Sequence, residues 1–117
     1  MLVLALFGAG PAALAEGTFV PAANRMDMAY DEIRHVLYIS NGPELVRFQV
    51  STKTMLDPIA IGGQLTGLDI SPDGKTLAVE DYYFDFNKLQ NRVYLVDMES
   101  LSVKTVNFEQ ERLEGGT

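Results

Sequence analysis

One stretch of the chain, residues 65–80, constrains the fold more than any other. Leu68 and Ile70 alternate with polar or small residues before a tight cluster of turn formers, and Leu77 and Val79 alternate after it. Alternation with a period of two is typical of a half-buried β-strand. Between the two runs, proline presets φ, aspartate bonds its own backbone and glycine accepts positive φ. The stretch therefore predicts a β-hairpin whose structural turn is formed by Pro72, Asp73 and Gly74.

This hairpin belongs to a longer unit that occurs twice. Each unit is predicted to contain four short strands and no helix; the strands cover 26–30, 36–40, 45–50 and 55–61, then 66–71, 76–80, 91–97 and 102–108. Gly62-Gly63 ends the first unit, and Gly115-Gly116 lies at the corresponding place in the second. A four-stranded unit that repeats with a period in the forties is the sequence signature of a propeller blade.

The spacing between the units locates an insertion. The separation from Val46 to Val93 is longer than the separation from Asp27 to Asp69. The difference predicts extra residues between the second and third strands of the second unit. Asp27 and Asp69 then occupy equivalent positions, which favours a structural role in turns over catalysis. Pro58, inside the fourth predicted strand, indicates an outer sheet edge, where a lost ladder hydrogen bond costs little.

Two segments carry a resemblance to a known family. Residues 67–79, GLDISPDGKTLAV, resemble the core of a YVTN-type β-propeller repeat, and residues 91–97, NRVYLVD, are similar to its third strand. The family includes lactonase-like and quinoprotein amine dehydrogenase-like propellers. The resemblance spans Asp27 to Phe108 and implies an all-β fold with four-stranded antiparallel β-propeller blades. The tetrapeptide Tyr-Val-Thr-Asn that names the family is absent, and the first unit lacks the Pro-Asp-Gly-Lys turn.

The resemblance implies two blades of an incomplete propeller, in a ring of about seven. Closed propellers contain about 4–8 blades, because each blade buries its faces against two neighbours. We therefore expect further blades, either within a longer protein or from other copies of the chain. The predicted organisation is a signal peptide at 1–15, a lead-in segment at 16–25, blade one at 26–63, and blade two with the start of the next blade at 64–117.

The N-terminal residues have the pattern of an export signal. The apolar run from Leu2 to Leu14 is too short to span a bilayer. It ends in Ala-Leu-Ala before Glu16, the small-x-small pattern expected at a signal-peptidase site, although no Lys or Arg precedes the run. We expect an exported protein, periplasmic or extracellular, with no transmembrane segment after cleavage. The alternative is a buried N-terminal helix or strand.

Composition argues against several classes of function. The net charge is −7 and the nine Lys and Arg form no patch, which disfavours nucleic-acid binding. The chain has no cysteine and a single histidine, His35, whereas nucleophilic triads and transition-metal sites need several partners. No phosphate-binding Gly-rich loop, nucleophile elbow or zinc-binding helix is present. We predict no catalytic residue and no cofactor in this chain alone.

Three loops are expected to meet at one end of the molecule. In the topology that the resemblance implies, the connections at 41–44, 62–64 and 81–90 share one end. The last loop combines four aromatic residues with two carboxylates and an amide, so that rings can stack on a ligand and oxygens can orient it. The candidate residues for binding a ligand or partner are Asp81, Tyr82, Tyr83, Phe84, Asp85, Asn87, Gln64 and Asn41.

Two other interpretations of the aromatic loop stay open. Tyr82, Phe84 and Phe86 alternate, as they would in a β-extension that packs on the next blade. Asp81, Asp85 and Asn87 offer oxygen ligands for Ca²⁺, but their spacing lacks the Gly and the bidentate Glu of an EF-hand. We therefore predict no metal site beyond this calcium candidate.

The sequence leaves two function hypotheses. The first is a binding or scaffold module whose loops engage a protein, carbohydrate or small-molecule partner. The second is part of a lactonase-like or quinoprotein dehydrogenase-like enzyme whose catalytic residues come mostly from other blades. Propellers of one fold host both kinds of function, so the fold alone does not choose between them.

Overall fold

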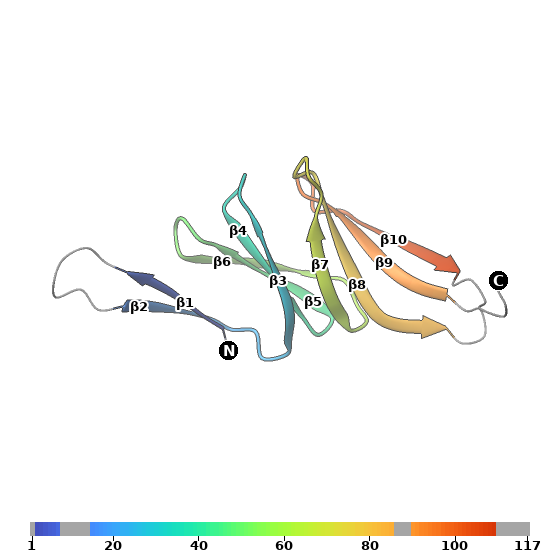
Figure 1. The fold of residues 1–117 in the computed structure, drawn as a ribbon, viewed down its shortest axis with the longest axis horizontal. Helices are drawn as coiled ribbons and strands as arrows, with labels where there is room; N and C mark the ends of the chain where they lie inside the picture. Colours follow the sequence, from blue (N-terminus) through green and yellow to red (C-terminus); the bar gives the residue numbers. More distant parts are fainter. Residues whose placement is uncertain (1, 8–14, 86–89, 110–117) are drawn as a thin grey trace.

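The computed structural model describes residues 2–7, 15–85 and 90–109, and this part of the chain consists of β-strands and turns without a helix (Figure 1). A hairpin of β1 (Leu2–Phe7) and β2 (Ala15–Val20) comes first. Sheet I follows, with β3 (Arg25–Asp31), β4 (Val36–Asn41), β5 (Glu44–Gln49) and β6 (Thr54–Ala60) in sequential order. Sheet II contains β7 (Leu65–Ile70), β8 (Thr76–Asp85), β9 (Gln90–Asp97) and β10 (Val103–Glu109), again in sequential order.

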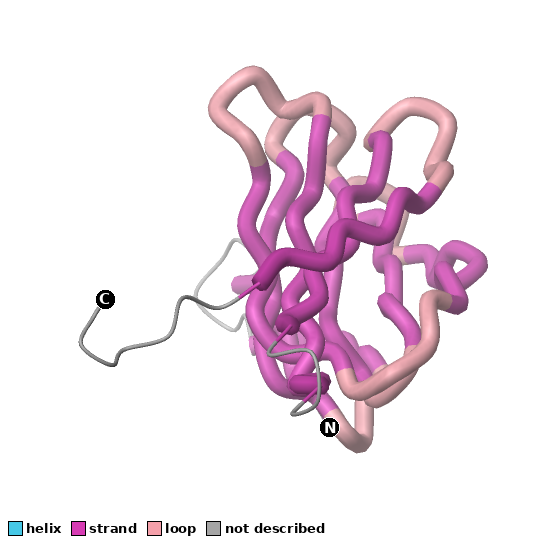
Figure 2. The backbone as a smooth tube through the Cα atoms, turned by 90° about the vertical axis from the view of Figure 1, so that its right-hand side faces the viewer, coloured by secondary structure: helices cyan, strands magenta, loops and turns pink. Residues whose placement is uncertain are grey.

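Both four-stranded sheets are antiparallel, as predicted, and the eight predicted strands are all present. β8 is longer than expected and continues through Tyr82 to Asp85. Seen from the side, the sheets stand next to each other with turns at both ends of their strands (Figure 2). Among the described residues, no helix has the length and apolar character needed to cross a membrane.

The two sheets share a core because one face of each sheet is apolar. Val36, Tyr38 and Leu45 of sheet I pack in one cluster with Leu77 and Val79 of sheet II, and all five are at most 5% exposed. Partly buried side chains at the margins add to this core; they are Ala29, Leu56, Ile59, Ile61, Leu68 and Ile70. Burying an aliphatic side chain of this size contributes roughly 1.5–3 kcal/mol. The contact between the sheets is therefore the main source of cohesion in the structure.

The opposite face of sheet I forms a second core. Its members come from alternate positions of β4 and β5, and they pack with residues 20 and 22 of the preceding segment; the cluster contains Leu37, Ile39, Val46, Phe48, Val20 and Ala22. The alternation along β5 separates its side chains onto two faces, since Leu45 lies in the first core and Val46 and Phe48 lie in the second. The two central strands of sheet I, β4 and β5, are thus buried on both faces.

Strand pairing shows that the two sheets are built in the same register. Arg25 pairs with Asn41 as Leu65 pairs with Asp81, so the first two strands of the sheets are related by one common offset along the chain. Val79 pairs with a residue of β9 that lies further along the chain than the common offset of the first two strands predicts. The third strands of the two sheets are therefore related by a larger offset. The insertion predicted between the second and third strands is confirmed, and it forms the extension of the β8–β9 hairpin.

The expected equivalence of Asp27 and Asp69 is wrong. The strand pairing shows that Asp27 corresponds to Gly67. Pairing Asp27 with Asp69 would require extra residues in the second hairpin, but the pairs Tyr30–Leu37 and Ile70–Leu77 enclose the same number of residues. Each first strand also contains a bulge, at 26–27 opposite Ser40 and at 66–67 opposite Glu80. A bulge inserts one unpaired residue, which residue alternation in the sequence does not reveal.

The prediction for Pro58 is confirmed. It lies in β6, an edge strand of sheet I, as the strand order shows. The register between β5 and β6 shifts at this point, so that Asp57 and Pro58 together stand opposite Val46. Proline cannot donate a ladder hydrogen bond, and a bulge in an edge strand is one of the places where that loss is harmless.

The lead-in segment differs from the sequence-based expectation. The sequence predicts an irregular segment at 16–25, but residues 15–20 form β2 and pair with β1 in the register Leu2 to Val20 through Phe7 to Ala15. The sequence AEGTFV shows no sustained alternation of apolar and polar residues, so its strand forms through pairing with β1. Removal of residues 1–15 as a signal peptide would take β1 away and leave β2 unpaired.

One polar network joins the sheets at the end where β3 turns into β4. The Arg34 guanidinium donates to the Asp31 carboxylate at 3.0 Å, to the Gly74 carbonyl oxygen at 3.0 Å and to the Glu99 carboxylate at 2.8 Å. The hydrogen bond with Glu99, and next that with Asp31, raise the pKa of Arg34 above its usual range. Gly74 and Glu99 belong to sheet II, so one side chain of sheet I ties the two sheets together.

We predict that Gly74→Val lowers stability. Gly74 has a φ of +72° in the turn between β7 and β8, a conformation that a β-branched residue adopts only with strain. The expected loss is about 1–3 kcal/mol in the free energy of unfolding, measured by urea titration. Lys75→Ala in the same exposed turn is the control and should change stability by about 0.5 kcal/mol or less. Equal stability of Gly74→Val and the wild type would contradict the turn geometry.

The polar network gives a second prediction. Arg34→Ala should lower the melting temperature more than Glu99→Gln, because it removes all three hydrogen bonds and leaves the carboxylate of Asp31, 2% exposed, without its cation. Glu99 is largely exposed, and such ion pairs contribute little. Differential scanning calorimetry of the two variants tests this order. A larger effect of Glu99→Gln would show that the tie between the sheets depends on the surface pair instead.

Candidate functional site

Hydrogen bonds bring three loops together at the end of the strands opposite the Arg34 network. We call this surface the loop end and define it as residues 41–44, 61–64 and 81–82. The Pro43 carbonyl oxygen accepts from the amides of Ile61 and Gly62 at 3.0 and 2.8 Å. The amide of Leu65 donates to the Gly42 carbonyl oxygen at 2.9 Å. The expected gathering at one end is therefore present for residues 41–44 and 62–64 and for the start of the 81–90 segment, whose residues 86–89 lie outside the described part of the chain.

Asp81 connects the third loop to the other two. Its carboxylate accepts from the Gln64 amide at 3.0 Å and from the Tyr94 hydroxyl at 2.7 Å, and the Tyr82 amide donates to the Gln64 carbonyl oxygen at 2.9 Å. Asp81 is only 9% exposed. A carboxylate this deep, bonded to a backbone amide and a hydroxyl, fixes the position of the loop.

Tyr94 is a residue of this site that the sequence did not point to. Burial, and after it the hydrogen bond with Asp81, raise the pKa of Tyr94 above its usual value of 10.0. The hydroxyl therefore stays protonated at neutral pH and remains a donor to the carboxylate. The signal available in the sequence was a tyrosine among alternating aliphatic residues of β9, since a buried tyrosine hydroxyl needs a polar partner.

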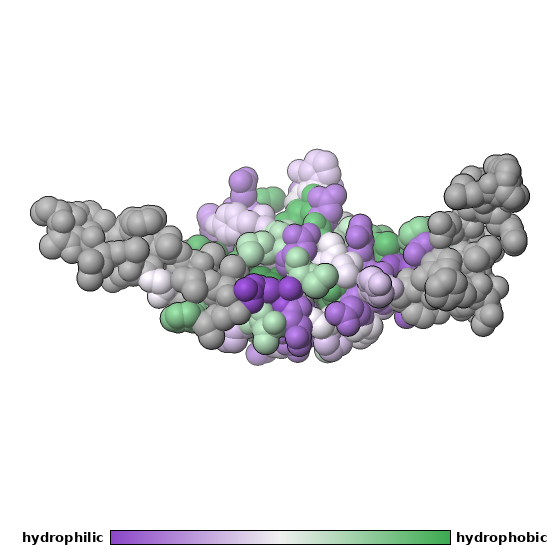
Figure 3. Space-filling view, turned by 60° about the horizontal axis from the view of Figure 1, so that its bottom comes forward, coloured by the Kyte–Doolittle hydropathy of each residue, from purple (hydrophilic) through white to green (hydrophobic). Residues whose placement is uncertain are grey.

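Three groups of the loop end face solvent or lie close to it. Tyr82 is 80% exposed, and Gln64 is exposed beside it. Asn41 is half-buried, and its side-chain oxygen accepts from the Asn24 amide at 2.7 Å. Figure 3, in which this end of the molecule is turned forward, shows polar and apolar side chains interspersed over the described surface. An exposed ring beside amide groups can stack on a flat or apolar ligand while the amides bond its polar groups.

The remaining candidate residues are only partly covered by the structure. Tyr83, Phe84 and Asp85 lie in the extended part of β8, where the backbone of Phe84 pairs with Asn91 and that of Asp85 pairs with Gln90. This extended, paired backbone is the conformation that the β-extension hypothesis predicts. The side chains of these three residues and all of Asn87 lie outside the described residues, so the calcium hypothesis stays a prediction. Within the part of the chain that the structure describes, no three His, Cys, Asp or Glu side chains form a group suited to a metal ion.

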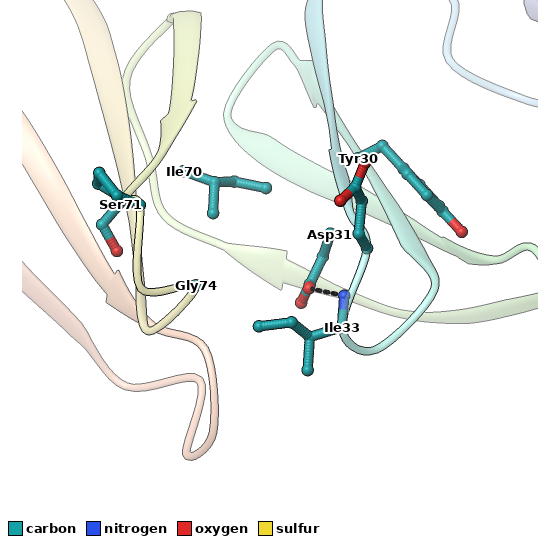
Figure 4. A pocket seen from close by; sticks show the side chains of 8 residues that line it. Tyr30, Asp31, Ile33, Ile70, Ser71 and Gly74 are labelled. Carbon is teal, nitrogen blue, oxygen red and sulfur yellow. Dashed lines mark hydrogen bonds between the residues drawn. The ribbon is translucent and has the colours of Figure 1, made fainter.

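A small cleft lies at the other end of the sheets, between the β3–β4 and β7–β8 turns (Figure 4). Its volume is about 190 Å³, below the roughly 300 Å³ at which ligand pockets usually begin. The Asp31 carboxylate beside it accepts from the amides of Ile33 and Arg34 at 3.0 and 3.2 Å, besides its ion pair. The Asp31 carboxylate and its donors therefore already hydrogen-bond to one another. Ile33 and Ile70 form apolar walls of the cleft. The cleft is a small gap between two packed turns whose polar groups are already paired. The loop end is therefore the better candidate site.

The loop end yields a prediction about Gly63. A Cβ at this position would overlap the Asp81 carboxylate, whose Cγ would lie 2.8 Å away, and the φ of Gly63 is +71°. We expect Gly63→Ala to destabilise the fold clearly more than Gly42→Ala. Gly42 is a matched control, because its φ is +62° and a Cβ there meets nothing within 4 Å. The difference between the two variants in urea titrations isolates the contact with Asp81, and equal losses would contradict the position of its carboxylate.

Comparison with known proteins adds no family assignment. No protein-family model matches the chain, and no curated protein sequence matches it significantly. The resemblance to propeller repeats therefore depends on the sequence segments around the β7–β8 turn and in β9.

Proposed function

We propose that the chain forms two blades of a β-propeller of the YVTN type and that it acts as an exported binding module through its loop end. The observation that carries the proposal is the loop end itself. Three loops from both sheets are held together by backbone hydrogen bonds, and an aromatic ring, Tyr82, stands 80% exposed beside them. Binding residues are commonly found on loops that a rigid scaffold positions in this way.

The arrangement of the sheets supports the propeller part of the proposal. Each sheet is a four-stranded meander, the two stack through apolar faces, and equivalent strands recur in the same order and register. The same hydrogen bond also recurs in both sheets: the Val50 amide donates to the His35 carbonyl oxygen at 2.9 Å, and the Met98 amide donates to that of Lys75 at 2.9 Å. A unit with one repeated internal geometry is suited to radial repetition.

The export part of the proposal depends on the N-terminal pattern of an apolar run followed by Ala-Leu-Ala. An exported module with an exposed tyrosine beside amide groups fits carbohydrate or protein partners, which offer flat rings and many hydrogen-bonding groups. The groups at the loop end that carry hydrogen bonds inside the fold, Asp81 and Tyr94, keep the loops in place for such a partner.

The proposal predicts that Tyr82→Ser removes binding. The labelled protein is applied to a printed array of oligosaccharides and peptides, and its affinity for each bound probe is compared with that of the variant. Loss of a central aromatic contact should weaken binding about ten- to thirtyfold. Met55→Ser is the control, because Met55 is 43% exposed but lies on β6 at the opposite end of sheet I. Equal effects of the two substitutions, or no bound probe at all, would contradict a binding role for the loop end.

A further inference from the structure

The edge strand β10 of sheet II is regular, whereas the other edge strands of the two sheets are interrupted (Figure 1). β3, β6 and β7 each carry a bulge, at 26–27, 57–58 and 66–67. β10 pairs with β9 at every position from Val103 to Glu109 without a register shift. Bulges and prolines hinder the pairing of an exposed edge with another chain. The described part of β10 therefore lacks the protection that the other edges have.

The hydrogen-bond pattern shows which backbone groups of β10 face away from β9. At the start of the pairing, the Asp97 amide donates to the Ser102 carbonyl oxygen at 2.9 Å. Residue pairs of an antiparallel ladder alternate between hydrogen-bonded and non-hydrogen-bonded positions. The alternation turns the amides and carbonyls of three β10 residues outward, and these are Val103, Thr105 and Asn107. They form a row of donors and acceptors that no strand of the described structure pairs with.

The side chains beside this row are exposed and mostly uncharged. Val103 is 38% and Phe108 is 47% exposed, and Thr105 between them is exposed as well. Lys104 carries the one charge of this stretch; it stands opposite Leu95 of β9 and forms no ion pair with a described residue. A hollow of about 270 Å³ lies between Lys104 and Leu95. The edge therefore leaves both a positive charge and space beside it for a side chain of an incoming strand.

We propose that the outer edge of β10 binds an extended peptide segment of a partner, which adds an antiparallel strand to sheet II. The backbone of the segment bonds the outward groups of β10, and an acidic residue of the segment pairs with Lys104. Apolar residues of the segment lie against Val106 and Phe108. Only an extended backbone repeats its hydrogen-bonding groups at the spacing of a strand, so the edge itself specifies this class of occupant. The proposal does not depend on what the loop end binds, so the two proposals fail separately.

The test uses the complete chain and a fluorescein-labelled peptide, Ser-Val-Thr-Ile-Thr-Glu-Val. The peptide is designed to run antiparallel to β10 with its glutamate opposite Lys104. Fluorescence anisotropy should show saturable binding as the protein is titrated. N-methylation of the two threonine amides, which face β10 in this register, should abolish binding. N-methylation of the isoleucine and glutamate amides, which point away from β10, should leave the affinity unchanged.

Matching variants change the protein side of the contact. Thr105→Pro removes one outward donor and should weaken peptide binding about tenfold or more. Because the Thr105 amide does not bond to β9, the variant should keep the urea midpoint of the wild type. Thr105→Ala retains the amide and is the control. Lys104→Glu should weaken binding about three- to tenfold, and a peptide with lysine in place of its glutamate should restore binding to this variant.

The methylated peptides decide the question without any change to the protein, so an unfolded variant cannot imitate the expected result. A wild type that does not bind the peptide would overturn the proposal. Equal binding of the two methylated peptides, or equal effects of Thr105→Pro and Thr105→Ala, would overturn it as well. Sedimentation velocity covers the remaining occupant: larger species that Thr105→Pro removes, together with an unbound peptide, would assign the edge to a second copy of the chain instead.

Discussion

The stacking of sheet I on sheet II is the interaction on which the rest of the structure depends. A four-stranded sheet of short strands has two faces and little to bury within itself, so its stability must come from a neighbour. Tyr38 and Leu45 on one side meet Leu77 and Val79 on the other, and all four are withdrawn from water. The turns, the loop end and the polar network keep their positions because these two faces stay together.

Apolar packing alone does not fix how the two sheets are aligned, and polar contacts between them supply this alignment. The hydroxyl of Ser40 donates to the Thr66 carbonyl oxygen at 2.7 Å, and the Asp27 carboxylate accepts from the Leu68 amide at 2.9 Å. Together with the Arg34 network at the far end, these bonds hold the first strand of sheet II against sheet I at one register. Such bonds contribute about 1 kcal/mol each, so they select an arrangement more than they drive its formation.

Much of the architecture could be predicted from the sequence, and the errors have physical causes. The strand positions, the turn at Gly74, the edge position of Pro58 and the insertion after β8 follow from alternation and turn chemistry. The match of Asp27 to Asp69 failed because bulges and equal turn lengths leave no mark in residue type. The strand at 15–20 was missed because its conformation depends on pairing with residues 2–7. At the loop end, the meeting of the loops was predictable from topology, but the burial of Asp81 against Tyr94 was not.

The sequence by itself determined which residues form strands, which way their side chains alternate and where the chain reverses, because these properties depend on neighbours within a few positions. The tertiary structure decided which faces meet and which side chains remain available. Asp81 and Tyr82 are adjacent in sequence, yet one is fixed beneath the loops and the other is exposed to a partner. Alternation along β8 directs their side chains to opposite faces, but only the assembled structure decides that the face of Asp81 is covered and that Tyr82 stays exposed, because solvent exposure is a property of packed surfaces.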